Sequence, residues 1–192
     1  YVVAGAMMEA LADTTWEALL RREVWDPLGI EGGGFGAPGG IHGHRGTPED
    51  GLAPVPPSPF ADNIPAMGPG ARVHLPLEGY GRFLAAVLAG ARGEGDPGFL
   101  RPESWAILHS PGGSGATGEE GGPPYALGWG LLPPAGEGAL PPLQHAGSNT
   151  LWLALARVDP ARDRAVALLL NDGRMELISP AVVRTLETLL GG

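Results

Sequence analysis

Apolar residues recur every three or four positions in several segments of the chain, a period that predicts α-helices. A helix is already under way in the opening YVVAGAMMEAL, where Val3, Met7 and Leu11 form one stripe. A second is predicted from Thr14-Thr15-Trp16-Glu17, which matches a capping box, to Asp26-Pro27, where proline disfavours helix. Three further helices are predicted over residues 76–90, 101–110 and 179–190, each with a proline near its start.

Short apolar segments in the last third of the chain predict strands instead. They are bounded by turn residues and cover 125–132, 151–158 and 165–171, with a hairpin loop at 159–164. Between the helices, Glu31–Gly70 contains 19 Gly or Pro among 40 residues and predicts a long loop or linker. A second Gly/Pro-rich loop is predicted over 111–124.

Helices, then antiparallel strands, then a packing helix indicate an α+β fold. The predicted division is a mainly helical region with long Gly/Pro-rich loops over 1–124, followed by antiparallel strands and a C-terminal helix over 125–192. Because the chain opens inside a helix, we expect it to be part of a longer protein.

Composition narrows the possible partners and chemistry. The chain has 192 residues and a net charge of −9, which argues against nucleic acid and anionic membranes as partners. No apolar run approaches 18 residues, so no transmembrane segment is predicted. There is no cysteine, and all 12 basic residues are arginine, so no lysine of this chain can act as a base or form a Schiff base.

Three motifs are set aside. GFGAPG (34–39) has the spacing of a dinucleotide loop, but Pro38 and the Gly/Pro-rich chain that follows favour an ordinary loop. His42 and His44 lie near two acidic residues in a flexible stretch, and two imidazoles do not supply the three or four ligands of a zinc site. Ser114 in GGSGA lacks the strand and helix that flank a nucleophile elbow.

The stretch LQHAGSNTLWLALA (143–156) leaves two interpretations open. His145 could end a strand at the surface, or it could belong to a hydrolase site. Side chains alternate along a strand, so His145 and Ser148 point to opposite faces and do not form a simple dyad. Gly147 would let a substrate approach closely, and an edge-strand N–H can donate to a developing oxyanion.

Five segments in order carry a resemblance that favours the second interpretation. They are YVVAGAMMEAL, VWDPLGI, GPGARVHLPLEGYGRFLAAVLAG, FLRPESWAILHSP and YALGWGLL. Together they resemble the serine β-lactamase and penicillin-binding-protein superfamily, nearest the class C-like esterases and D-aminopeptidases. The match runs the length of the chain and implies the C-terminal part of the β-lactamase/transpeptidase-like fold.

The resemblance assigns His145-Ala146-Gly147 to the family's third motif, Lys-Thr-Gly or His-x-Gly. It implies that His145 orients and polarises the site and that the Ser148 N–H forms half of an oxyanion hole. The substrate's acyl group is then expected beside Ala146, Gly147 and Asn149. No metal or other cofactor is implied.

The family's nucleophile and base are absent from this chain. Ser-x-x-Lys needs a lysine, and Val3 stands where Tyr-x-Asn would need asparagine after Tyr1. Both motifs are therefore expected upstream, in a missing N-terminal segment that would be this chain's partner. The expected function is a serine hydrolase that forms an acyl-enzyme with an ester, amide or lactam, and this chain alone is expected to be inactive. The alternative is a non-catalytic binding or regulatory relative that keeps the fold.

Overall fold

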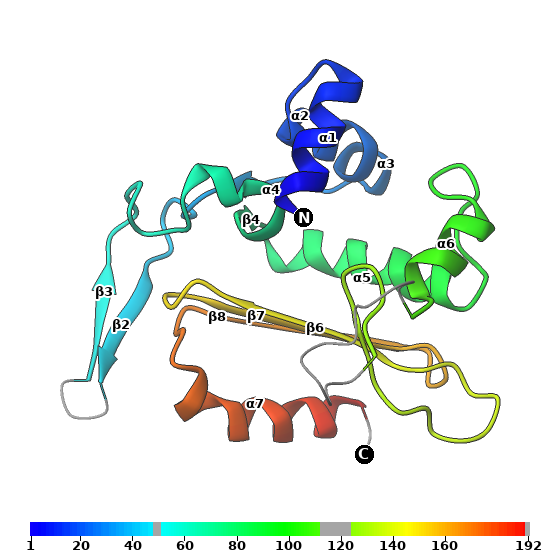
Figure 1. Cartoon of the computed structure of the whole chain (residues 1–192). Coiled ribbons are helices and arrows are strands. Elements are labelled where there is room, and N and C mark those ends of the chain that lie inside the picture. The colour runs from blue at the N-terminus through cyan, green and yellow to red at the C-terminus, as the bar shows by residue number, and fades with distance from the viewer. Residues whose placement is uncertain (48–50, 112–123, 191–192) are drawn as a thin grey trace. The chain divides into compact units, whose positions relative to one another are not determined.

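The structure is a computed structural model that describes residues 1–47, 51–111 and 124–190. Its helices and strands form an α+β protein (Figure 1), as the order of sequence patterns predicts. The chain divides into two compact units. Unit 1 consists of Tyr1–Arg82, Gly147–Ala154 and Leu169–Ser179, and unit 2 of Phe83–Ala146, Leu155–Leu168 and Pro180–Gly192.

Unit 1 begins with a series of short helical segments: α1 (Val2–Ala12), α2 (Trp16–Leu20), the π-helical η1 (Arg21–Trp25) and α3 (Asp26–Leu28). The helical run continues to Leu28, one residue beyond the predicted stop at Asp26-Pro27. Pro27 lies in the first turn of α3, which continues directly from η1. The helix ends instead at Gly29, whose left-handed φ of 62° suits a glycine cap.

The cap of α2 also lies one residue later than the sequence predicts. Thr15, not Thr14, is the N-cap residue, and its Oγ1 accepts a hydrogen bond from the Ala18 N–H at 3.2 Å. The Trp16 N–H donates to Glu9 Oε1 at 3.0 Å. A carboxylate of α1 thus satisfies one of the free N–H groups at the start of α2.

An aromatic cluster joins these helices to the next segment. The Phe35 ring stacks on Trp25 at 5.1 Å between centroids and meets Trp16 edge-on at 4.8 Å. The Arg21 guanidinium lies 4.6 Å from the Trp25 ring centroid and 5.1 Å from that of Phe35. Such cation–π contacts favour keeping the charge beside the rings.

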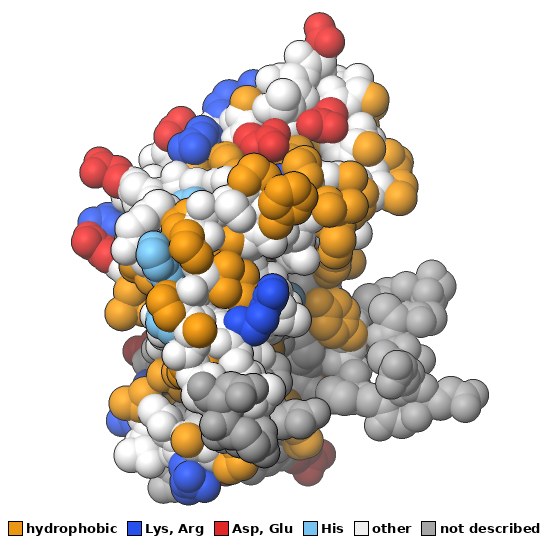
Figure 2. Space-filling model, turned by 90° about the vertical axis from the view of Figure 1, so that its left-hand side faces the viewer, with side chains coloured by type: hydrophobic (Ala, Val, Ile, Leu, Met, Phe, Trp, Pro, Cys, Tyr) orange, Lys and Arg blue, Asp and Glu red, His pale blue; other side chains and the backbone are white. Residues whose placement is uncertain are grey.

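The region predicted as a long loop contains regular structure. Strand β1 (Gly34–Phe35) pairs with β4 (Val73–His74), and β2 (Gly43–Thr47) forms an antiparallel pair with β3 (Gly51–Val55). Two short helices follow, η2 (Pro65–Met67) and α4 (Gly68–Ala71). This part of the chain leaves apolar side chains in solvent, Phe60 the most with 94% of its surface exposed. Apolar side chains are also prominent on the face drawn in Figure 2.

Unit 2 has its own hydrophobic core. It contains the second half of α5 (Leu77–Ala91) and all of α6 (Pro102–His109). Leu84 and Val87 of α5 and Trp105 of α6 are buried. Gly90 permits this packing, because a side chain there would collide with the Trp105 ring.

Four strands form one sheet in the order β5-β6-β7-β8: Gly130–Leu131, Leu143–Ser148, Leu153–Asp159 and Arg164–Leu170. The last two and their connecting turn confirm the predicted hairpin. Strand β5 is much shorter than the predicted 125–132. The segment before it folds into a turn in which the Ala126 N–H donates to the Trp129 carbonyl at 2.7 Å.

The last helix, α7 (Met175–Leu190), contains Pro180 and begins four residues before the predicted start at Ser179. A turn precedes it, in which the Arg174 N–H donates to the Asp172 carboxylate at 3.1 Å. In unit 2, α7 lies along one face of the strands (Figure 1) and buries Val182, Leu186 and Leu190. These residues are four positions apart, which is the spacing of an apolar helix face.

Candidate functional site

Strand β6 carries the predicted site residues and changes character along its length. Leu143 is 1% exposed and Gln144 is half-buried, whereas the four residues from His145 to Ser148 are exposed. Strand β5 pairs with β6 only at Gly130↔Gln144 and Leu131↔Leu143. Within the described part of the chain, the second half of β6 therefore has no β5 partner.

The pairing with β5 fixes the direction of the β6 peptide groups. The Leu132 N–H donates to the Pro142 carbonyl at 2.9 Å, and Gly130 is opposite Gln144 two residues on. In an antiparallel ladder the residues that exchange hydrogen bonds with one neighbour alternate along the strand. From this alternation we infer that the N–H groups of Gln144, Ala146 and Ser148 face away from β7.

His145 contacts an aromatic ring from the segment before β5. Its imidazole meets the Trp129 ring edge-on, with 6.1 Å between centroids, and Trp129 is itself buried. The exposed imidazole makes no hydrogen bond to any other residue that the structure describes. It is therefore free to interact with a molecule from solvent.

Gly147 stands next to open space. A Cβ atom built at this position has no described atom within 4 Å, and Ala146 beside it is exposed. A second molecule can therefore approach this backbone closely.

Ser148 directs its hydroxyl into a turn. Its Oγ accepts a hydrogen bond from the Thr150 N–H at 3.1 Å. No hydrogen bond joins Ser148 to His145 within the described residues, in agreement with the alternation of side chains along a strand.

Asn149 uses both ends of its amide within the protein. Its Oδ1 accepts hydrogen bonds from the N–H groups of Leu151 and Trp152, each at 3.1 Å, and its Nδ2 donates to Asp62 Oδ1 at 2.8 Å. The Asp62 side chain is only 7% exposed. Asp62 could not be predicted from the sequence, because nothing in a Gly/Pro-rich segment indicates a contact with a residue 87 positions away.

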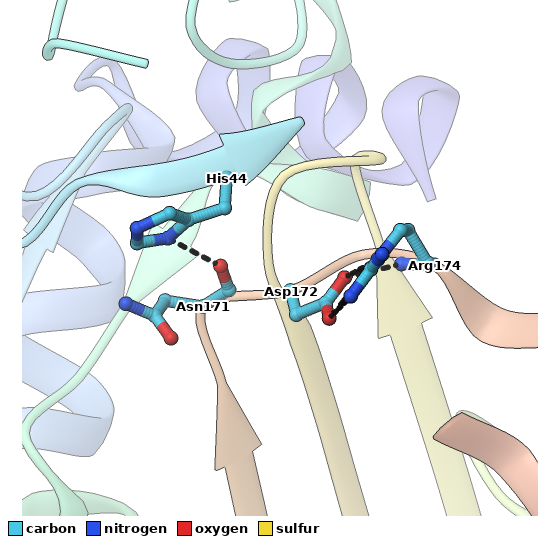
Figure 3. A network of polar contacts seen from close by, with 4 residues as sticks. All are labelled: His44, Asn171, Asp172 and Arg174. Atoms are coloured by element: carbon cyan, nitrogen blue, oxygen red, sulfur yellow. Dashed lines mark hydrogen bonds and ion pairs between the residues drawn. The ribbon is translucent and has the colours of Figure 1, made fainter. Parts of the chain in front are cut away.

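A second polar cluster lies where β2 meets the end of β8 (Figure 3). His44 Nδ1 donates to the Asn171 carbonyl at 3.0 Å, and Asp172 forms a two-pronged ion pair with Arg174 at 2.8–2.9 Å. The hydrogen bond from Arg174 holds the pKa of Asp172 below its ordinary value. An acidic carboxylate paired in this way is a structural contact rather than a general base.

The motifs set aside in the sequence acquire no functional geometry among the described residues. No group of three or more His, Asp or Glu side chains there is arranged to hold a metal ion. The segment GFGAPG forms β1 and a bend, with no helix after it. Ser114 lies outside the described residues.

Burial raises the pKa of Tyr80 to about 12, so this phenol stays protonated near neutral pH.

None of the helices that the structure describes combines the length and the apolar composition required to cross a membrane.

Solved structures show the fold. The octameric penicillin-binding protein homologue from Pyrococcus abyssi is 18% identical and aligns with 95% of this chain at a TM-score of 0.69. SurE is 19% identical and aligns with 100% of this chain at a TM-score of 0.74. The structure of SurE with D-Leu is also 19% identical and aligns with 100% of this chain, at a TM-score of 0.63. The aligned region is 41%, 43% and 41% of these three proteins, so this chain spans about two fifths of their length.

Sequence comparison agrees with the structures. No curated protein matches the chain. A family model described as Beta-lactamase matches residues 1–181. The chain therefore belongs to the Beta-lactamase family and has the fold of the C-terminal part of its penicillin-binding-protein-like members.

Proposed function

We propose that the protein containing this chain is a serine hydrolase that forms an acyl-enzyme with an ester, an amide or a lactam. Family membership supports the reaction class. A serine without an adjacent base is a poor nucleophile, and this chain has no lysine. The nucleophile and its lysine then come from a Ser-x-x-Lys motif, and the second proton carrier from a Tyr-x-Asn motif, both outside this chain.

In this proposal the chain supplies the groups that stabilise charge on the substrate. The exposed second half of β6 is the observation that carries the proposal, because alternation along the strand predicts a Ser148 N–H that faces away from β7 there. This N–H donates to the oxyanion of the tetrahedral intermediate. His145 polarises the site, and the acyl group lies over Ala146 and Gly147. Asn149 contributes through the turn that it holds.

A histidine at position 145 favours esters and peptides over β-lactams. A lysine at this position would hold a substrate carboxylate with a permanent charge, which an imidazole ring does not provide. One structural relative is SurE with D-Leu, so D-leucine esters and amides belong in the set of test substrates.

The experiment uses the full-length protein. We expect labelling by a fluorophosphonate and faster turnover of short-chain esters than of nitrocefin. Ser148→Pro removes the N–H on the strand side that faces away from β7, where a proline breaks no bond to β7. It should lower kcat by about 100- to 1,000-fold. Ser148→Ala keeps the N–H, so its kcat should fall far less.

A full-length protein that neither labels nor turns over any of these substrates would contradict the proposal. So would a folded Ser148→Pro variant with the same kcat as Ser148→Ala. In the first case the alternative holds, namely a non-catalytic binding relative. That alternative also predicts that Ser-x-x-Lys or Tyr-x-Asn is missing from the rest of the gene product.

A further inference from the structure

Asp62 is a buried carboxylate in the segment between β3 and η2. Its Oδ1 accepts hydrogen bonds from Asn149 Nδ2 and from the Asn63 N–H, both at 2.8 Å. Arg72 Nε lies 3.6 Å from Asp62 Oδ2, and the two side chains are 18% and 7% exposed. Burying a carboxylate is costly unless it is paired and hydrogen-bonded, and these three contacts meet that requirement.

The carboxylate determines which way the Asn149 amide faces. An ionised carboxylate only accepts hydrogen bonds, so the NH₂ end of Asn149 must point at Asp62. The oxygen end then faces the backbone, where it receives the Leu151 and Trp152 N–H groups. Reversing the amide would lose all three hydrogen bonds, so Asp62 fixes the orientation of Asn149.

The turn that Asn149 holds is strained. Thr150 has a left-handed φ of 72°, which is unfavourable for a β-branched residue and persists only where its surroundings fix it. Asn149 Oδ1 binds the turn on one side of Thr150, and Ser148 Oγ binds the Thr150 N–H itself. The Ser148 peptide group lies directly before this turn, so its direction depends on the same contacts.

We propose that Asp62 is a positioning residue for the Ser148 N–H and acts through Asn149. The inference rests on the proposed function, because it treats that N–H as an oxyanion donor. Asp62 touches neither substrate nor reacting atoms. It instead positions the Ser148 peptide group, whose N–H is the proposed oxyanion donor. A displacement of about 1 Å in such a group can lower the rate about 100-fold.

The test exchanges the two side chains in the full-length protein. Asn149→Asp places two carboxylates where the 2.8 Å hydrogen bond was, and like charges at such a distance repel. We expect kcat for a short-chain ester to fall by roughly 10- to 100-fold with a smaller change in KM. The kcat of Asp62→Asn should fall less, because the amide oxygen of the new side chain can still accept a hydrogen bond from Asn149.

The combined variant Asp62→Asn/Asn149→Asp restores a donor facing a carboxylate. Its kcat should return to within about threefold of that of Asp62→Asn, which a double-mutant cycle measures as coupling. Asp96→Asn is the matched control. Asp96 Oδ1 likewise accepts a nearby backbone N–H, from Gly98 at 2.8 Å, in a turn with no part in the proposal, so turnover should be unchanged.

Hydrogen exchange of the Ser148, Leu151 and Trp152 amides provides a readout independent of turnover. Exchange should accelerate in Asn149→Asp and recover in the combined variant. Unaltered kcat and exchange in Asn149→Asp, or a combined variant that is folded but no better than Asn149→Asp, would overturn the inference. A wild-type protein without labelling or turnover would instead refute the proposed function, and the exchange data alone would then decide whether Asp62 positions this peptide.

Discussion

The histidines of the chain show how strongly a single residue depends on its surroundings. His74 Nδ1 donates to the Gly36 carbonyl at 2.7 Å, and His44 Nδ1 donates to the Asn171 carbonyl. His109 instead stacks on the buried Trp105 ring, with 5.5 Å between centroids. Burial lowers the pKa of His109 from its ordinary value of 6.5.

The lowered pKa of His109 predicts acid sensitivity. Above about pH 6.5 the imidazole is neutral in both the folded and the unfolded protein, so its contribution to stability is intact. As the pH falls below about 6.5, the unfolded state takes up the proton before the folded state does, and stability is lost until the pH has passed the lowered folded-state pKa. His109→Gln should flatten the fall in unfolding free energy between about pH 7 and pH 5. Chemical denaturation at several pH values measures this.

His42→Gln is the control for that experiment, because it removes an exposed imidazole. If His109→Gln and the wild-type protein lose the same free energy over this pH range, the packing of His109 is not as described.

Candidate site residues could be picked out where the signal lies in neighbouring positions of the sequence, as in His145-Ala146-Gly147-Ser148. Alternation along a strand predicts that the side chains at 145 and 148 are separate, and no hydrogen bond joins them among the described residues. These site residues themselves stay a prediction. Asp62 could not be found in this way, because its role depends on a hydrogen bond to a distant residue.

At the scale of elements, the cap of α2 gives a sharp test. Thr15 accepts the Ala18 N–H, whereas the sequence pattern favours Thr14 as the cap. Thr15→Ala should lower the free energy of unfolding by about 1 kcal/mol. Thr14→Ala is the matched control and should lower the free energy of unfolding by less. Equal losses, measured by thermal or chemical unfolding, would contradict the cap described here.

Elements with a strong apolar period were predictable, and those that depend on distant partners were not. The α5 face with Leu84 and Val87 and the β7–β8 hairpin follow from spacing alone. The β2–β3 pair was missed because glycine and proline dominate its sequence, although five residue pairs align across it. The start of α7 was missed because Pro180 is a common helix start, and here it lies within the helix.

At the scale of the whole molecule, the apolar stripe of α1 is exposed to solvent in the part of the chain that the structure describes. Val3, Met7 and Leu11 are 73%, 61% and 86% exposed, although their spacing is that of a helix face that packs on a core. The related structures are more than twice as long as the region that they share with this chain. We propose that the N-terminal segment of the protein covers this face.

This proposal predicts that the 192-residue chain alone has no hydrolase activity and binds a dye specific for exposed apolar surface. Co-expression with the N-terminal segment should restore ester turnover and reduce dye binding. The mutation Leu11→Glu should weaken this restoration of turnover. Glu17→Gln on α2, which leaves the apolar stripe of α1 unchanged, is the control. Turnover by the isolated chain would show that the nucleophile lies within it.

The clearance beside Gly147 allows the size of the bound molecule to be measured. Its φ lies outside the left-handed range and no described atom lies within 4 Å of a Cβ there. Alanine, valine and phenylalanine at 147 should therefore be tolerated by the fold, with melting temperatures close to that of the wild type. If the acyl group of the proposed substrate lies beside Gly147, turnover of long-chain esters should fall before that of acetyl esters as the side chain grows, which the series measures without a bound ligand.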